Sequence, residues 1–244
     1  MRTRLVLVGV AVLACSGGGE SKDTRPAGGA TAAVQGSPSA RPAGTDTGSA
    51  VGSAATRSRP KVLIIGTSLT AGLGIDPNQA YPADLQHLAD SSGYSVEIVN
   101  GGWRGDLGGA LRRVDWLLND QPAIVMIETG ANDGLRGLDP DSTAANIKAT
   151  IGKIRGRYPA TTILLAQMEA PPNFGPAYTR KFHDLYPRTA KEQGVILLPF
   201  LLDSVAGVSR LNQADGIHPT VEGARIVARN VWRTLGPQVA RLDR

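Results

Sequence analysis

Two segments of the sequence hold the residue types that serine-dependent acyl transfer requires. Ser68 lies in residues 66–72, and Asp215 and His218 lie three residues apart in residues 215–219. A carboxylate that holds one imidazole nitrogen leaves the other nitrogen free to take a proton from a serine hydroxyl. Each segment also has an ordinary alternative: a serine after a glycine often caps a helix, and a histidine in a turn is often incidental.

Two glycine-containing segments hold groups that suit the stabilisation of an oxyanion. Asn132 lies in residues 130–134, and its amide is a neutral hydrogen-bond donor. Gly105 lies in residues 101–106, where the lack of a side chain lets backbone N–H groups approach a substrate closely. Taken one at a time, both segments are equally compatible with plain turns, since Asn, Asp and Gly are frequent there.

The elements that must position these residues follow from the hydrophobic pattern. Short β-branched or apolar runs predict strands at residues 61–65, 95–99, 123–128, 161–167 and 195–198. Helical spacing predicts helices at residues 81–91, 106–119, 141–157 and 178–193, and a last one that starts after Pro219 and runs to about 235. Pro219 itself suits a first helical position. This alternation predicts an α/β fold with a parallel sheet covered on both faces. In such folds ligands bind at the carboxyl ends of the strands, which is where the four segments lie.

Several other residues near these segments are assigned provisional roles. Glu128 and Asp133 flank the Asn132 segment, and we expect both to be structural. Trp103 and Arg136 could contact substrate or simply pack. Residues 170–176, with two adjacent prolines, follow the fourth strand where a stiff flap over a substrate would lie.

The sequence lacks the residue patterns that metal or cofactor chemistry requires. The three histidines have no paired spacing, and His87 and His183 lie in amphipathic helical stretches where we expect surface positions. Cys15 is the only cysteine, so an intramolecular disulfide and a cysteine-based zinc site are excluded. A phosphate-binding loop and a Gly-x-Ser-x-Gly nucleophile elbow are both absent from the sequence. We therefore expect no metal and no cofactor.

The four segments together, in this order at four strand ends, resemble the SGNH hydrolases, also called the GDSL esterase family. The similarity is strongest to the bacterial arylesterases, lysophospholipases and acyl-thioesterases, and it covers about residues 60–238. It is carried by Gly-Thr-Ser-Leu-Thr-Ala-Gly, Gly-Ala-Asn-Asp-Gly-Leu-Arg-Gly and Asp-Gly-Ile-His-Pro. The resemblance implies a three-layer α/β/α sandwich with a flavodoxin-like, parallel five-stranded sheet.

The resemblance also implies roles for individual residues. Ser68 would be the nucleophile, His218 the general base and acid, and Asp215 the group that orients the imidazole. The backbone N–H groups of Ser68 and Gly105 and the side chain of Asn132 would form the oxyanion hole. The chain departs from the family at residue 67, where threonine replaces the aspartate of Gly-Asp-Ser-Leu.

The N-terminal region has the composition of an export signal followed by a linker. Two arginines precede an apolar stretch at residues 5–14, which is too short to span a bilayer but suits a signal peptide. Residues 12–15 resemble a bacterial lipoprotein box, which implies a signal peptide at 1–15 and lipidation of Cys15; an ordinary secretory signal with an incidental cysteine is the alternative. Residues 16–60 are rich in Gly, Ala, Ser and Pro and predict a disordered tether before a hydrolase domain at 61–244.

The charge distribution argues against nucleic-acid binding. The net charge is +5, but seven basic and only three acidic residues precede Lys61, so the remaining chain is nearly neutral. The expected partners are a small-molecule acyl ester and a membrane reached through the lipid anchor, with the protein monomeric and exported to the periplasm or the outer membrane. The expected activity is that of a serine esterase acting on carboxylic esters, aryl esters, lysophospholipids or acyl-thioesters. Two alternatives stay open: an O-deacetylase of cell-envelope glycans and a non-catalytic envelope lipoprotein.

Overall fold

The computed structural model describes residues 58–103 and 107–242. The predicted signal peptide, its Cys15, nearly all of the predicted tether and Gly105 lie outside the described residues. The first strand begins at Lys61, the residue at which the hydrolase domain was predicted to begin.

The described residues form a five-stranded parallel sheet with the strand order β2-β1-β3-β4-β5. Its strands are β1 (Lys61–Ile65), β2 (Glu97–Gly101), β3 (Ile124–Ile127), β4 (Thr162–Ala166) and β5 (Ile196–Leu198). This order is that of flavodoxin-like doubly wound sheets, in which a ligand site lies where β1 and β3 diverge. In register, Ile65 lies opposite Gly101 on one side and Ile127 on the other, so the loops after these strands begin at one edge.

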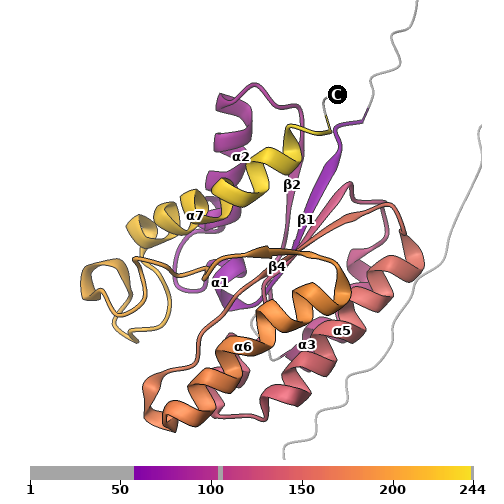
Figure 1. Cartoon of the computed structure of the whole chain (residues 1–244). Coiled ribbons are helices and arrows are strands. Elements are labelled where there is room, and N and C mark those ends of the chain that lie inside the picture. The colour runs from indigo at the N-terminus through magenta and orange to yellow at the C-terminus, as the bar shows by residue number, and fades with distance from the viewer. Residues whose placement is uncertain (1–57, 104–106, 243–244) are drawn as a thin grey trace, which may run out of the picture. The chain divides into compact units, whose positions relative to one another are not determined.

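Helices cover both faces of the sheet, as Figure 1 shows. One face carries α2 (Tyr81–Ser91) and α7 (Val221–Val239), which pack against each other. The other carries α3 (Leu107–Leu117), α5 (Pro140–Arg157) and α6 (Pro176–Gln193). The three-layer α/β/α sandwich predicted from the sequence is therefore confirmed.

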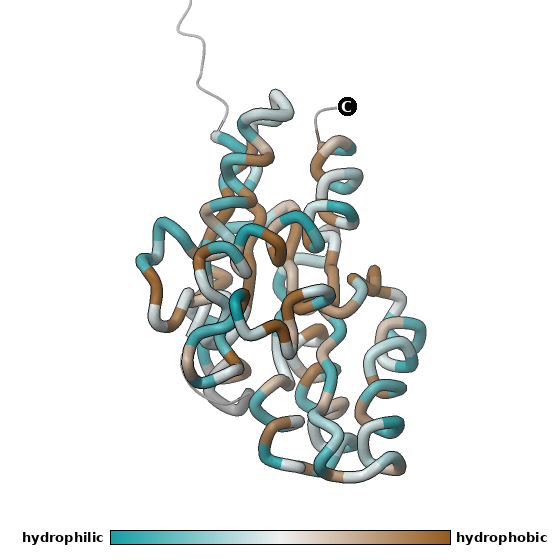
Figure 2. Tube along the Cα trace, turned by 90° about the vertical axis from the view of Figure 1, so that its left-hand side faces the viewer, coloured by the Kyte–Doolittle hydropathy of each residue, from teal (hydrophilic) through white to brown (hydrophobic). Residues whose placement is uncertain are grey.

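The core lies between the sheet and these helices. The strands β1, β3 and β4 are buried almost throughout, because a parallel sheet covered on both faces has no solvent-facing side. Along the helices, apolar residues recur among polar ones, as the colours of Figure 2 show. These apolar stripes pack on the sheet and bury large side chains such as Leu85, Ile147, Ile151, Phe182 and Val231.

The structure differs from the predicted elements at several places. The second strand runs from 97 to 101 rather than 95 to 99, because Asn100 and Gly101 pair with β1 instead of forming a turn. Pro219 is not the first helical residue: Thr220 caps α7 by accepting a hydrogen bond from the Gly223 N–H, and Pro219 forms an isolated bridge with Asn212. Tertiary pairing overrides local turn and helix preferences in both cases.

Short helices that the hydrophobic pattern did not predict occupy the loops at the carboxyl edge of the sheet. They are α1 (Ser68–Ala71), α4 (Ala131–Arg136) and the 3-10 turns η1 (Pro77–Gln79), η2 (Pro172–Phe174) and η3 (Ser209–Leu211). Each spans six residues or fewer, too short for a 3.6-residue hydrophobic period to register. In the described part of the chain, no helix is both long enough and apolar enough to cross a membrane.

Candidate active site

Ser68 is the first residue of α1, immediately beyond the sheet. The chain leaves β1 through Gly66 and Thr67, and Thr67 takes the N-cap position in an extended conformation. A Cβ at Gly66 would lie 1.9 Å from the Thr70 hydroxyl oxygen, so only glycine allows this close turn. The helix ends after four residues at Gly72, whose φ of 65° is left-handed. Ser68 does not cap this helix, which leaves its hydroxyl available for other partners.

Asp215 and His218 lie on a tight turn before α7. One oxygen of the Asp215 carboxylate accepts hydrogen bonds from the N–H groups of Ile217, at 2.9 Å, and His218, at 3.0 Å. Gly216, the residue after Asp215, has a φ of 70°, a conformation that favours glycine. The turn therefore orients the carboxylate by its own backbone and points its second oxygen at the imidazole.

Ser68, His218 and Asp215 form a continuous hydrogen-bonded series. His218 Nδ1 lies 2.6 Å from Asp215 Oδ2, and His218 Nε2 lies 2.9 Å from Ser68 Oγ. Hydrogen bonds from the His218 side chain and from the Ile217 and His218 N–H groups lower the pKa of Asp215 to about 2. Asp215 is therefore ionised and only accepts, so Nδ1 carries the imidazole proton and Nε2 is free to accept from the serine hydroxyl.

Gln213 links the segment after α1, which follows Ser68, to the turn that carries His218. The sequence patterns did not identify it. Its side-chain amide donates to the carbonyl of Leu73, 2.7 Å away in the segment after α1, and to the carbonyl of Pro219, at 2.9 Å. Its backbone N–H donates to the His218 carbonyl at 2.7 Å. No motif marks this residue, because its role depends on two segments that meet only in the folded chain.

Asn132 lies beside Ser68, in the second position of α4. The helix begins after Gly130, whose φ of 96° lets the chain turn sharply out of β3. Asn132 and Ser68 line the same groove, as the oxyanion-hole prediction requires of them. Gly105, the third predicted member, lies outside the described residues; the loop that leads to it reaches Trp103, whose N–H donates to the Thr67 carbonyl at 3.1 Å.

An apolar groove of about 190 Å³ opens beside the Ser68 hydroxyl. Most of its walls are hydrocarbon, and its polar members are Ser68, Asn132 and Asn212. The apolar lining comes from four loops at the carboxyl edge of the sheet and comprises Leu69, Ala131, Leu135, Pro171, Leu202, Ala206 and Ile217. A groove of this kind accommodates an apolar substituent next to a nucleophile.

The flap predicted at residues 170–176 contains η2 and contributes one residue to this groove. Pro171 lines the groove, whereas the ring of Phe174 packs at a tilt of 54° against the ring of Tyr178 of α6, with 5.3 Å between the ring centroids. The segment is thus a wall of the groove anchored to α6.

The other residues for which the sequence indicated possible roles lie around the carboxyl edge of the sheet. Glu128 is fully buried below α1, and Asp133 is buried and accepts from the Thr143 hydroxyl at 2.9 Å. Trp103 is exposed with the Arg113 guanidinium 4.5 Å above its ring, and Arg136 is exposed in the last turn of α4.

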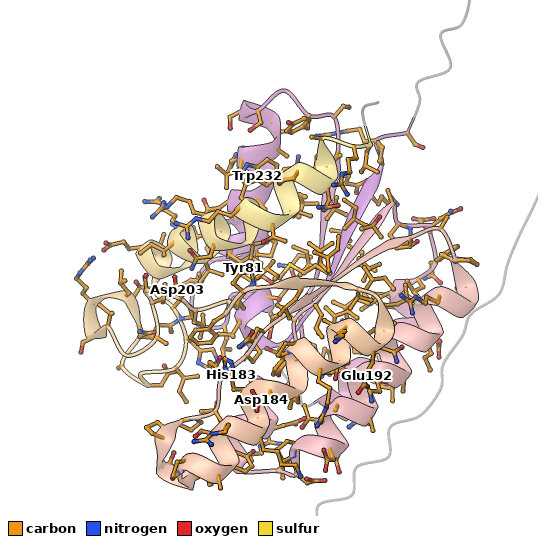
Figure 3. All side chains as sticks on the ribbon, viewed as in Figure 1. Tyr81, His183, Asp184, Glu192, Asp203 and Trp232 are labelled. Atoms are coloured by element: carbon orange, nitrogen blue, oxygen red, sulfur yellow. The ribbon has the colours of Figure 1, made fainter. Side chains whose placement is uncertain are left out.

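His87 and His183 are both exposed, as predicted. His183, which projects from α6 in Figure 3, bonds through Nδ1 to Glu169 at 2.8 Å. Across residues 58–103 and 107–242, no cluster of three or more His, Cys, Asp or Glu side chains could hold a metal ion.

A serine, an imidazole and a carboxylate in hydrogen-bonded series, beside an apolar groove at the carboxyl edge of a doubly wound sheet, define a hydrolase of the serine class. Residues 64–226 match the model of the GDSL-like lipase/acylhydrolase family. The match spans more than half of the chain and includes Ser68, Asn132, Asp215 and His218. The chain belongs to this family and is an enzyme that hydrolyses ester bonds.

Named proteins from three bacteria are similar over most of the chain. Esterase TesA of Pseudomonas aeruginosa is 38% identical over 178 residues, which cover 72% of this chain and 88% of that protein. An arylesterase of Vibrio mimicus is 35% identical, covering 75% of this chain and 92% of its own. The thioesterase 1/protease 1/lysophospholipase L1 of Escherichia coli is 34% identical, covering 73% of this chain and 84% of its own.

The fold comparison agrees with the sequence comparison. The crystal structure of a psychrotrophic esterase, EstA from Pseudoalteromonas, inhibited by monoethylphosphonate, superposes with a TM-score of 0.69 at 28% identity. The match covers 74% of this chain and 98% of EstA. The SGNH hydrolase fold implied by the four sequence segments is therefore confirmed.

Proposed function

We propose that this chain is an exported serine esterase in which Ser68 is the nucleophile, His218 the general base and acid, and Asp215 the orienting carboxylate. The single observation that carries the proposal is the 2.9 Å contact between His218 Nε2 and Ser68 Oγ at the mouth of the apolar groove. Such a contact allows proton transfer at the moment of attack.

The reaction then follows from the positions of these groups. The Ser68 hydroxyl transfers its proton to His218 Nε2 as Oγ bonds to the carbonyl carbon of the ester. The oxyanion of the tetrahedral intermediate accepts hydrogen bonds from the Ser68 N–H, the Gly105 N–H and the Asn132 amide. His218 gives the proton to the departing alcohol, which leaves an acyl group on Ser68. Water, deprotonated by His218, attacks the acyl carbon, and Ser68 recovers its proton when the acid departs.

The groove supports an acyl chain as its occupant. Most of its walls are hydrocarbon, and two of its lining residues, Leu135 and Ile217, are exposed. We propose carboxylic esters of short to medium acyl chains as substrates, with aryl esters, acyl-thioesters and lysophospholipids in the same class. The names of the related proteins, which include an arylesterase and a thioesterase and lysophospholipase, support this range.

A chain-length series of p-nitrophenyl esters with the full chain tests the substrate class. The two methylenes that butyrate has beyond acetate should contribute about 1.6 kcal/mol if the groove buries them, or roughly 15-fold in kcat/KM. We expect kcat/KM to rise in this way from acetate to butyrate. A steep fall beyond acetate would instead identify an O-deacetylase and contradict the acyl-groove proposal.

A variant in the groove and a matched control outside it test whether the groove holds the acyl chain. Ala206 lines the groove, so A206W should remove most of the gain from acetate to butyrate while leaving acetate hydrolysis within about threefold. Ala160 is exposed in the loop before β4, at the opposite edge of the sheet. A160W should therefore keep the wild-type chain-length profile.

Removing the Asn132 amide should slow turnover without unfolding the protein. Loss of one oxyanion donor costs roughly 100- to 1,000-fold in kcat. We expect Asn132→Ala to show this loss in p-nitrophenyl butyrate hydrolysis with a KM and a thermal unfolding temperature close to those of the wild type. A kcat within threefold of the wild type would show that Asn132 does not donate to the oxyanion.

We further propose that the protein is exported, anchored through lipid on Cys15 and monomeric. The support is the arrangement of the sequence: an apolar stretch after two arginines, a cysteine at its end, and a Gly-, Ala-, Ser- and Pro-rich tether at residues 16–60. In this arrangement the signal peptide is removed before Cys15, and the tether holds the hydrolase at the periplasmic or outer-membrane surface.

A further inference from the structure

Glu128 is a buried carboxyl group that the proposed reaction does not use. It follows the last residue of β3, and none of its surface is exposed. Among the described residues, none of the ion pairs includes it. A carboxylate buried without a cation is costly unless hydrogen-bond donors surround it, so its partners indicate why it is there.

The partners of Glu128 flank Ser68 on both sides. Glu128 Oε2 accepts from the Thr67 N–H at 2.8 Å and from the Thr70 hydroxyl at 2.7 Å. Glu128 Oε1 accepts from the Thr67 hydroxyl at 2.9 Å. Three donors, from the residue before Ser68 and the residue two places after it, converge on one carboxyl group.

A series of hydrogen bonds runs from Glu128 through Thr70 to Tyr81. The Thr70 hydroxyl donates to Glu128, so the Tyr81 hydroxyl, 2.6 Å away, must donate to Thr70. Figure 3 shows Tyr81 projecting from α2 toward α1. Burial raises the pKa of Glu128, and the hydrogen bonds from Thr67 and Thr70 oppose that rise. The net pKa of Glu128 is raised, because burial is the largest of these effects.

We propose that Glu128 is the positioning residue of the nucleophile: it clamps Thr67 and Thr70 so that the Ser68 hydroxyl faces His218. This inference rests on the proposed role of Ser68. A four-residue helix has no stability of its own, and Thr67 makes no side-chain cap to α1. The orientation of Ser68 therefore depends on tertiary anchors, and the Glu128 carboxylate is the anchor on both flanks.

The clamp also accounts for threonine at position 67. The Thr67 hydroxyl is a neutral donor 2.9 Å from a buried carboxylate. An aspartate at the same place would bring a second carboxylate against Glu128, and one of the two would have to hold a proton. Threonine instead places a neutral hydroxyl against Glu128, and both carboxyl oxygens are paired.

Two variants of the clamp, assayed in the full chain, test the proposal. Glu128→Ala removes the anchor, and Thr67→Val removes one hydroxyl donor while keeping the shape of the side chain. We expect kcat for p-nitrophenyl butyrate to fall roughly 100-fold in Glu128→Ala and roughly tenfold in Thr67→Val, with KM within twofold, because a misplaced reacting group loses rate rather than binding. The rate of fluorophosphonate labelling of Ser68 should fall in parallel, and Thr67→Ser should restore both rates to within threefold.

A control at the same strand end separates positioning from stability. The Tyr186 hydroxyl donates to the Thr129 carbonyl at 2.9 Å, one residue beyond Glu128, and in the described structure it makes no hydrogen bond to Glu128, Thr67 or Thr70. Tyr186→Phe should lower the unfolding temperature but keep kcat and the labelling rate. The proposal is overturned if Thr67→Val and Glu128→Ala behave like Tyr186→Phe; if Glu128→Ala does not fold, Thr67→Val and Thr67→Ser decide. Wild-type labelling at Ser68 tests the proposed function separately, so the two failures are distinguishable.

Discussion

Replacing Ser68 by alanine is expected to reduce ester hydrolysis to the background rate. The hydroxyl that lies 2.9 Å from His218 Nε2 is the nucleophile of the acylation step in the proposed reaction, and its loss prevents formation of the acyl-enzyme. In serine hydrolases the loss of the nucleophile costs roughly a million-fold in kcat. Steady-state hydrolysis of p-nitrophenyl butyrate by the full chain, together with the mass increase on fluorophosphonate treatment, measures both consequences.

The control for this experiment is a serine outside the groove. Ser92, exposed at the end of α2, can be replaced by alanine with no expected change in hydrolysis or labelling. Ser68→Ala should keep the wild-type unfolding temperature within a few degrees, since among the described residues the hydroxyl has one hydrogen-bond partner, His218. Substantial activity or labelling in Ser68→Ala would assign the nucleophile to another residue.

Asp215→Asn is expected to lower kcat by roughly 1,000- to 10,000-fold while the fold is retained. The asparagine oxygen can still accept from the Ile217 and His218 N–H groups, so the turn keeps its shape. Its NH₂ group then faces His218 Nδ1 and favours the tautomer that carries the proton on Nε2. That tautomer cannot accept the Ser68 proton, which is why the loss falls on kcat.

A second aspartate provides the matched comparison for this variant. Asp184 lies on the exposed side of α6, and Asp184→Asn changes the net charge by the same amount without touching the site. It should leave kcat within twofold. If Asp215→Asn keeps more than a tenth of the wild-type kcat at an unchanged unfolding temperature, Asp215 does not orient the imidazole.

The residue patterns were sufficient to predict the layers and most element positions. A buried parallel strand is an uninterrupted apolar run, and a covering helix has an apolar stripe, so β1, β3, β4 and the long helices are visible one segment at a time. The errors lie where local preference competes with pairing. Asn100 and Gly101 form the end of β2 because β1 offers them partners, and Pro219 precedes the α7 cap because it pairs with Asn212.

The sequence by itself determined which residues are chemically competent and that the chain forms an α/β fold with a parallel sheet covered on both faces, because side-chain chemistry and hydrophobic period are local properties. Only the tertiary structure decided how those residues meet. Ser68 and His218 are 150 positions apart, and Gln213 and Glu128 act through segments distant in the chain, so no local pattern contains these contacts. The groove likewise exists because four loops converge at one edge of the sheet. Contacts between distant segments depend on strand order and loop packing, which are properties of the whole fold.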